Sequence, residues 1–150
     1  MLAAGSGYGS AGFPGENGGI DMLEVGIRGI QTEEVTNKNT AAAYGSGLLP
    51  VYATPALVAL MEKTCWTSVA STLGEGQGTV GTRLTISHTA PTPVGMAVTC
   101  ESELTAVEGR RLTFAVRAYD GKGEVGAGTH ERFVIDNARF LAKAGAKADA

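Results

Sequence analysis

The chain has 150 residues and a mass of 15.3 kDa, about the size of one domain, so separate cofactor-binding and substrate-binding domains are not expected. Its 43% hydrophobic and 18% charged residues are typical of a globular protein with a single core. With 12 basic and 15 acidic residues the net charge is −3, and no basic run is longer than Arg110-Arg111. This charge pattern excludes the basic surface of a nucleic-acid-binding protein.

The sequence also argues against a membrane-spanning helix, a metal site and disulfide bonds. It has no apolar run near the ~20 residues of a membrane-spanning helix, and no basic segment followed by an apolar one at its start. The two cysteines, Cys65 and Cys100, match neither a zinc-binding spacing nor a disulfide framework, so we expect them to be core or strand residues. We therefore expect a cytoplasmic protein that binds no metal and no membrane.

Glycine-rich sequence opens the chain, with seven glycines in the first nineteen residues and no periodic pattern. We interpret residues 1–20 as a flexible leader, 21–143 as the folded domain and 144–150 as a flexible tail. Within Asp21–Thr36, β-branched residues favour a strand over a helix. The polar and then glycine-rich stretch 37–50 predicts a mobile loop.

A helix is the strongest predicted element. Thr54 supplies an N-cap hydroxyl, Pro55 suits the first helical position, and Leu73-Gly74 ends the pattern. Because the first two turns are apolar on every side, we expect this helix to be buried.

Four segments of alternating hydrophobicity follow the helix, and each predicts a strand. Hairpin signals at Glu108-Gly109 and Asp120-Gly121 separate the last three. The four segments are Arg83 to Thr89, Met96 to Val107, Arg111 to Tyr119 and Glu124 to Ile135. One strand, a buried helix and an antiparallel meander indicate the α+β class, with a sheet wrapped around a central helix.

The segment GQGTVG at residues 76–81 matches the glycine pattern of dinucleotide-binding sites. In those sites the glycines follow a strand and open a helix, whose N-terminus receives the pyrophosphate. Here the order is reversed, because the glycines lie between a helix and a strand. The motif therefore predicts no cofactor.

Three polar side chains in apolar surroundings are candidates for catalysis. Glu62, inside the run VALMEKTC, lies either on a solvated helix face or in a pocket of low polarity, and helix geometry favours neither. Helix capping alone would explain Thr54. His88 shares a strand face with apolar residues, where histidine is more often a hydrogen-bonded core residue than a catalyst, and His130 has the weaker case.

Together these residues indicate more than each does alone. Glu62 lies eight positions after Thr54, just over two helical turns, so both side chains can face one pocket. With His88 they supply a hydroxyl, a carboxylate and an imidazole beside the amides of a helix N-terminus, which are the groups of an acyl-transfer site.

Four segments between Val51 and Ile135 carry recognisable motifs, namely VYATPALVALMEKTCW, VGTRLTISHTAPTPVGMAVTCESEL, VEGRRLTF and GAGTHERFVI. The most specific of these motifs is SHTAPTPVG followed by VEGRR and GTHER. They resemble the fluoroacetyl-CoA thioesterase family. The resemblance implies the hotdog fold, which is an α+β fold, and hydrolysis of an acyl-CoA thioester to a free acid and coenzyme A.

The resemblance also implies roles at individual positions. The catalytic threonine, glutamate and histidine of the family fall on Thr54, Glu62 and His88. Gly81 matches the glycine that approaches the acyl group, and Arg132 matches the family's arginine. Related hotdog thioesterases are homodimers with active sites at the subunit interface, and coenzyme A is part of their substrate rather than a cofactor.

One stretch departs from the family pattern. Where the family carries lid phenylalanines, this chain has Gly45 and Leu48, and Leu48 is expected to contact the acyl group. We therefore expect hydrolysis of a short- or medium-chain acyl-CoA rather than strict fluoroacetyl-CoA specificity, with Glu62 as general base or nucleophile. The alternatives are a non-catalytic acyl-CoA-binding hotdog protein and a hotdog dehydratase or hydratase.

Overall fold

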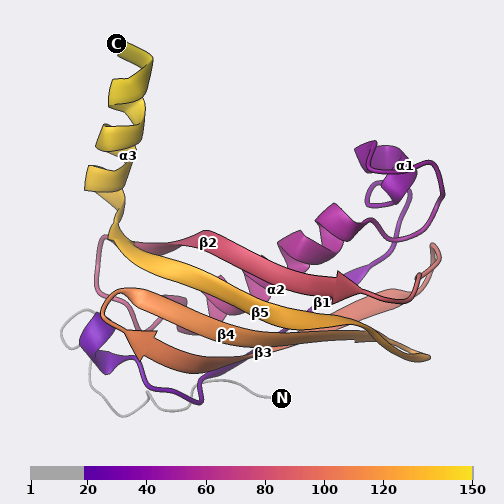
Figure 1. Ribbon diagram of the computed structural model, residues 1–150, viewed down its shortest axis with the longest axis horizontal. Helices are drawn as coiled ribbons and strands as arrows, with labels where there is room; N and C mark the ends of the chain where they lie inside the picture. The colour runs from indigo at the N-terminus through magenta and orange to yellow at the C-terminus, as the bar shows by residue number, and fades with distance from the viewer. Residues whose placement is uncertain (1–18, 150) are drawn as a thin grey trace.

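The computed structural model describes residues 19–149, so the expected leader lies almost entirely outside the described residues. Figure 1 shows a short strand and a long helix, followed by four long strands and a C-terminal helix. The elements are η2 (Ile20–Met22, a 3₁₀ helix), β1 (Arg28–Glu34), α1 (Ala41–Tyr44), α2 (Thr54–Ala70), β2 (Gln77–His88), β3 (Ala97–Glu108), β4 (Arg111–Asp120), β5 (Gly123–Asp136), α3 (Asn137–Ala146) and η3 (Lys147–Asp149, a 3₁₀ helix).

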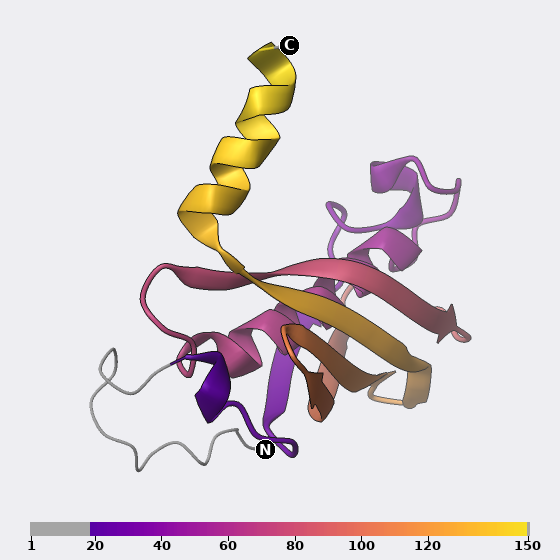
Figure 2. The same ribbon diagram turned by 60° about the vertical axis from the view of Figure 1, so that its left-hand side comes forward.

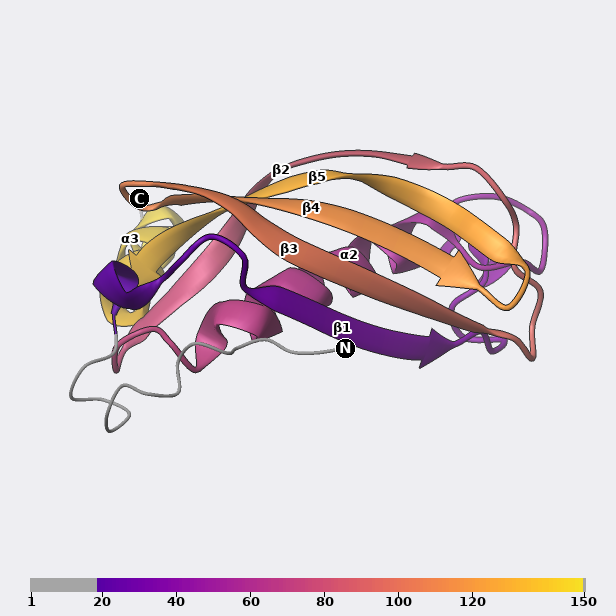
Figure 3. The ribbon, with the colours of Figure 1, turned by 90° about the horizontal axis from the view of Figure 1, so that it is seen from below.

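Within the described residues, five antiparallel strands form one sheet in the order β1-β3-β4-β5-β2. Tight turns join β3 to β4 and β4 to β5, where the Glu-Gly and Asp-Gly signals predicted them. Figure 3 shows the sheet curving over α2, which runs along its concave face. The expected α+β class, with a sheet wrapped around a helix, is confirmed.

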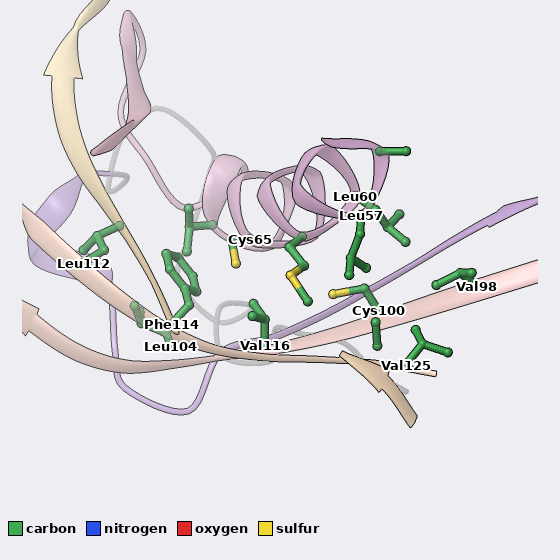
Figure 4. Packing of buried hydrophobic residues seen from close by; sticks show 14 of the residues in the cluster. Leu57, Leu60, Cys65, Val98, Cys100, Leu104, Leu112, Phe114, Val116 and Val125 are labelled. Atoms are coloured by element: carbon green, nitrogen blue, oxygen red, sulfur yellow. The ribbon is translucent and has the colours of Figure 1, made fainter. Parts of the chain in front are cut away.

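The core lies between this concave face and one side of α2. Strand β4 alternates between buried and more exposed residues, as expected for a sheet with one covered face. Figure 4 shows side chains of α2 pointing toward those of the sheet, among them Leu57, Leu60, Cys65, Cys100, Phe114 and Val116. Both cysteines are fully buried, as expected, and burial raises the pKa of Cys100 to about 11, so its thiol stays protonated.

Helix α2 is buried on one side only, which corrects the expectation of a fully buried helix. Ala59, Lys63 and Trp66 are exposed and follow one another at helical spacing on the side away from the sheet. The apolar first two turns misled the prediction, because a single sheet covers one face of the helix and no residue of 19–149 forms a second layer over the other.

Two boundaries near the start of the domain also differ from expectation. Strand β1 begins at Arg28 rather than near Asp21, because residues 20–22 form a 3₁₀ helix. The expected mobile loop contains the helical turn α1, where the Thr40 hydroxyl accepts a hydrogen bond from the Ala43 amide. Gly45 ends that turn with a φ of 76°, a conformation that favours glycine.

Strand β2 is longer than predicted, because it begins at Gln77 rather than Arg83. The GQGTVG segment therefore forms a turn and the start of a strand rather than a phosphate-binding loop before a helix. At the other end, α3 crosses the expected boundary between domain and tail at residue 143, and Figure 2 shows it projecting away from the sheet. Within residues 19–149, no helix is long and apolar enough to cross a membrane.

Candidate active site

The N-terminus of α2 and the end of β2 meet through two of the expected site residues. The Thr54 Oγ1 lies 2.8 Å from the His88 Nδ1, within hydrogen-bond distance. The His88 Nε2 is buried and has no hydrogen-bond partner among the described residues. Burial lowers the pKa of His88, against a smaller opposing effect of the Ala90 backbone, so the imidazole is neutral at pH 7. This pair leaves one imidazole nitrogen without a hydrogen bond to the described residues.

Thr54 does not cap its helix, which corrects the sequence prediction. The N-cap is Ala53, no side chain accepts a hydrogen bond there, and Thr54 is the first helical residue with Pro55 next. The Thr54 hydroxyl is therefore free of capping and bonds His88 instead. The amides of the first helical turn have no acceptor within the helix, which leaves donors at this end of the site.

The segment before Thr54 is fixed by buried polar contacts. The Tyr52 hydroxyl donates to Glu33 Oε1 over 2.6 Å, and Asn39 Nδ2 donates to Glu33 Oε2 over 3.0 Å. The Ala53 amide donates to the Asn39 carbonyl over 3.0 Å. Burial, helped by Glu33, raises the pKa of Tyr52, so its hydroxyl remains a donor. Strand β1 thus positions the start of α2.

A second polar group lies two turns further along α2, around Glu62. The Arg132 Nη1 donates to Glu62 Oε2 over 3.2 Å, while Arg132 Nε donates to the Thr79 Oγ1 over 2.8 Å. The Arg132 Nη2 donates to the Thr79 carbonyl over 3.0 Å. The guanidinium is buried, whereas the Glu62 side chain is 41% exposed. Arg132 therefore holds the carboxylate from the protein side and leaves its other side open.

His130 completes this second group. It is 2% exposed, and its Nδ1 lies 2.8 Å from the Arg83 carbonyl, which can only accept, so Nδ1 carries the proton. The Nε2 then accepts from Arg132 Nη1 over 3.1 Å and lies 3.9 Å from Glu62 Oε2. Burial lowers the pKa of His130, and the Arg132 cation adds to that effect, so the ring is neutral.

Gly81 lies directly against the Glu62 carboxylate. A Cβ at this position would collide with Glu62 Oε2 and come within 3.2 Å of both Arg132 Nη1 and His130 Cε1. The pairing of β2 with β5 shifts by one residue between Gly81 and Arg83, so the strand bulges at this point. Only glycine leaves the carboxylate in this place.

The structure thus brings the expected residues together in two groups. Thr54 with His88 forms one, and Glu62 with Gly81 and Arg132 forms the other. The offset of eight positions from Thr54 to Glu62 corresponds to about 12 Å along the helix axis, so the two groups do not contact each other. Leu48 is 92% exposed, beyond the α1 turn.

Sequence reasoning missed the buried contacts around Arg132. His130 was given the weaker case, and Thr79 was not considered. The available signal was periodicity, because His130 and Arg132 are two residues apart on one strand and so share the face that the helix covers.

Comparisons with known proteins show which family the chain belongs to. The model of the family described as FlK, fluoroacetyl-CoA-specific thioesterase, matches residues 35–138. A fluoroacetyl-CoA thioesterase from Streptantibioticus cattleyicolor is 50% identical over 93 residues, which are 62% of this chain and 67% of that protein.

Solved structures give the same result. A structure of the fluoroacetyl-CoA thioesterase FlK has a TM-score of 0.79 at 41% identity, covering 83% of this chain and 97% of that one. A hot-dog-like protein from Thermanaerovibrio acidaminovorans shares the fold, with a TM-score of 0.77 at 24% identity over 85% of this chain and 94% of that one. The chain is therefore an enzyme of the hotdog thioesterase class. More narrowly, it belongs to the fluoroacetyl-CoA-specific thioesterase family.

Replacing Gly81 by alanine tests whether the open side of Glu62 is where hydrolysis occurs. The added methyl group would displace the Glu62 carboxylate. Because a displacement of about 1 Å can slow catalysis about a hundredfold, we expect kcat/KM for thioester hydrolysis to fall by about that factor. Thiol release measured with a colorimetric reagent reports the change. Gly121→Ala is the matched control, because its methyl group makes an ordinary contact of 3.7 Å with Met96. Equal activity of both variants would contradict the assignment.

The lowered pKa of His130 predicts a pH dependence of stability. The unfolded chain takes up a proton at His130 as the pH falls through 6.5, whereas the folded chain does so only at lower pH. The free energy of unfolding should therefore fall as the pH is lowered between about 7 and about 5. His130→Gln should flatten this dependence in urea titrations. His88→Gln is measured beside it, because burial also lowers the pKa of His88. If the free energy of unfolding of His130→Gln depended on pH as steeply as that of wild type, His130 would not be a buried neutral imidazole.

Proposed function

We propose that this enzyme hydrolyses short- or medium-chain acyl-CoA thioesters to a free acid and coenzyme A, in the cytoplasm. The single observation that carries the proposal is the Glu62 carboxylate, held by Arg132 on one side and open above Gly81 on the other. The reaction needs no cofactor, since coenzyme A enters as part of the substrate. Two buried free thiols are consistent with a reducing compartment.

The chemistry follows from what a thioester needs. Glu62 supplies the oxygen that attacks the carbonyl carbon, or removes a proton from the water that does so. Donors for the carbonyl oxyanion come from the α2 N-terminus, where the Thr54 and Ala56 amides have no acceptor within the helix. The Nε2 of His88, which has no hydrogen-bond partner among the described residues, would interact with the departing thiolate or the water. Because thiols are acidic, with a pKa near 8.5 for cysteine, the leaving group needs little help.

The two groups of the site come together when two copies of the chain pair. Among the described residues, strand β2 has a neighbouring strand on one side only, and a twelve-residue exposed edge is a template for another strand. In an antiparallel pair of β2 strands about a two-fold axis between Gly81 and His88, Gly81 of one copy opposes the partner subunit's His88. We infer that each active site combines Glu62 and Arg132 of one protomer with the partner subunit's Thr54 and His88.

The acyl group enters beside the segment that precedes Thr54. Gly45 lacks a side chain there, and Leu48 and Tyr44 are exposed rather than packed into the core. A lid with glycine at position 45 and leucine at position 48 restricts the acyl pocket less than aromatic rings at both positions would. We therefore propose that Leu48 contacts the acyl chain and that chains longer than acetyl are accepted.

The direct test is thiol release from a series of acyl-CoAs from acetyl to octanoyl, with fluoroacetyl-CoA included. Glu62→Gln should reduce kcat about a thousandfold, within the range for loss of a general base, and Thr54→Ala should also reduce it. His88→Gln should cost less than Glu62→Gln, because the thiolate leaves readily. Lys63→Gln, next to Glu62 but exposed, is the control. If the folded wild type released no thiol from any ester, hydrolysis would be wrong.

Mixing two inactive variants tests the shared site. A dimer of one Glu62→Gln chain and one Thr54→Ala chain contains one site with both residues intact if the site spans two chains. A statistical mixture should then recover about a quarter of wild-type activity, because half of the dimers are mixed and half of their sites are intact. If each site belonged to a single chain, the mixture would stay as inactive as its components.

A further inference from the structure

Helix α3 has no packing partner within the described part of the chain. All residues of Asn137–Ala146 are exposed, including Phe140 and Leu141. The N-terminus of α3 is capped, since the Asp136 side chain accepts a hydrogen bond from the Arg139 amide over 3.0 Å. A ten-residue helix is nevertheless marginal in water without tertiary contacts, because its stability comes mainly from burial of an apolar face. This helix therefore lacks the contact that would stabilise it.

The sequence of α3 gives it two different faces. Arg139, Lys143 and Lys147 follow one another at a spacing of four, which places them along one stripe. Phe140 and Ala144 are four residues apart and Leu141 and Ala144 are three apart, so these three residues form a second, apolar stripe beside the basic one. Separate basic and apolar stripes are typical of a helix that lies on a protein surface.

The position of α3 indicates which surface this is. Its first residue, Asn137, is tied to the start of β2, because its amide donates to the Gly76 carbonyl over 2.9 Å. From there Figures 1 and 2 show α3 rising past β2, on the side where the sheet has no further strand. A chain that pairs with the β2 edge would lie beside this helix.

Antiparallel pairing determines which part of the second copy meets α3. The start of β2 in one protomer then lies near the end of β2 in its partner. At that end the chain exposes Val94 in the β2–β3 connection and Leu49 in the segment before α2, and Val51 and Pro93 bridge these two segments. An apolar surface therefore lies where the apolar face of α3 would arrive.

We propose that α3 is an arm that packs through Phe140 and Leu141 onto a second copy of this chain, against the partner subunit's Val94 and Leu49. The inference rests on the proposed homodimer and goes beyond it, because pairing of β2 alone needs no arm. The arm covers the segments that fix the partner subunit's Thr54. It therefore stabilises the dimer and holds the entrance of the partner's site at the same time.

Crosslinking between two distinguishable chains tests the contact. One chain carries Leu141→Cys, and a second chain with an affinity tag carries Val94→Cys. Strand β2 is about 35 Å long, so positions 141 and 94 of one chain lie too far apart for a short bismaleimide to join them. We expect a covalent species that contains both chains. As control, Val94→Cys is replaced by Ala115→Cys, which is exposed on the convex face. If the protein is dimeric by sedimentation and position 141 crosslinks equally well to positions 94 and 115, the proposed contact of the arm is wrong.

Substitutions in the arm give a second readout. Phe140→Asp with Leu141→Asp should raise the dimer dissociation constant at least tenfold and raise KM for the acyl-CoA that wild type hydrolyses best. Arg139→Gln with Lys143→Gln, on the basic stripe, should leave both unchanged. Unchanged dissociation and KM in the aspartate variant would refute the arm while hydrolysis by wild type still supported the proposed function. A wild type that hydrolyses nothing would refute that function, whatever the crosslink shows.

Discussion

The contact of one side of α2 with the concave face of the sheet determines where everything at the site lies. Burial of Leu57, Met61 and neighbouring residues fixes how the helix is rotated about its axis. Thr54 and Glu62, eight residues apart, then lie on one flank of the buried stripe. That flank faces β2, because Thr54 meets His88 and Glu62 meets Gly81. Hydrophobic packing alone thus brings two polar groups to the edge strand, with no polar contact between them.

The buried guanidinium of Arg132 is the constraint on the second group. Removing this cation from water is costly unless acceptors surround it, and the chain supplies Thr79, His130 and Glu62 in that role. His130 can accept only while it is neutral, and its other nitrogen is occupied by the Arg83 carbonyl. The bulge at Gly81 leaves room for the Glu62 carboxylate to meet the cation and to remain open to solvent on the other side. The Glu62 carboxylate can therefore be stabilised by Arg132 on its buried side and still react on its exposed side.

Local patterns predicted the parts of this structure that depend on local physics. The alternation of β4 and the glycine turns around it predicted the meander. The family resemblance named Thr54, Glu62 and His88 as candidates, of which the structure pairs Thr54 with His88. Thr54 was misread as a helix cap, because a threonine before proline suits capping whether or not a histidine lies nearby. The one-sided burial of α2 and the acceptor role of His130 depend on which element covers which face. Periodicity shows that His130 and Arg132 share a strand face, but it does not show which element covers that face.

Three features of the chain are incomplete on the same side of the molecule. Within residues 19–149, the β2 edge has unpaired backbone groups and the apolar face of α3 has no packing partner. The two polar groups of the site lie about 12 Å apart along α2. A partner at the β1 edge or on the convex face would satisfy one of these at most, because β1 is the edge of the sheet opposite β2. The proposed two-fold partner at the β2 edge would satisfy all three by antiparallel pairing, which brings opposite ends of the two strands together. In that proposed dimer, the pairing that completes the backbone ladder would also place each carboxylate opposite the other chain's imidazole.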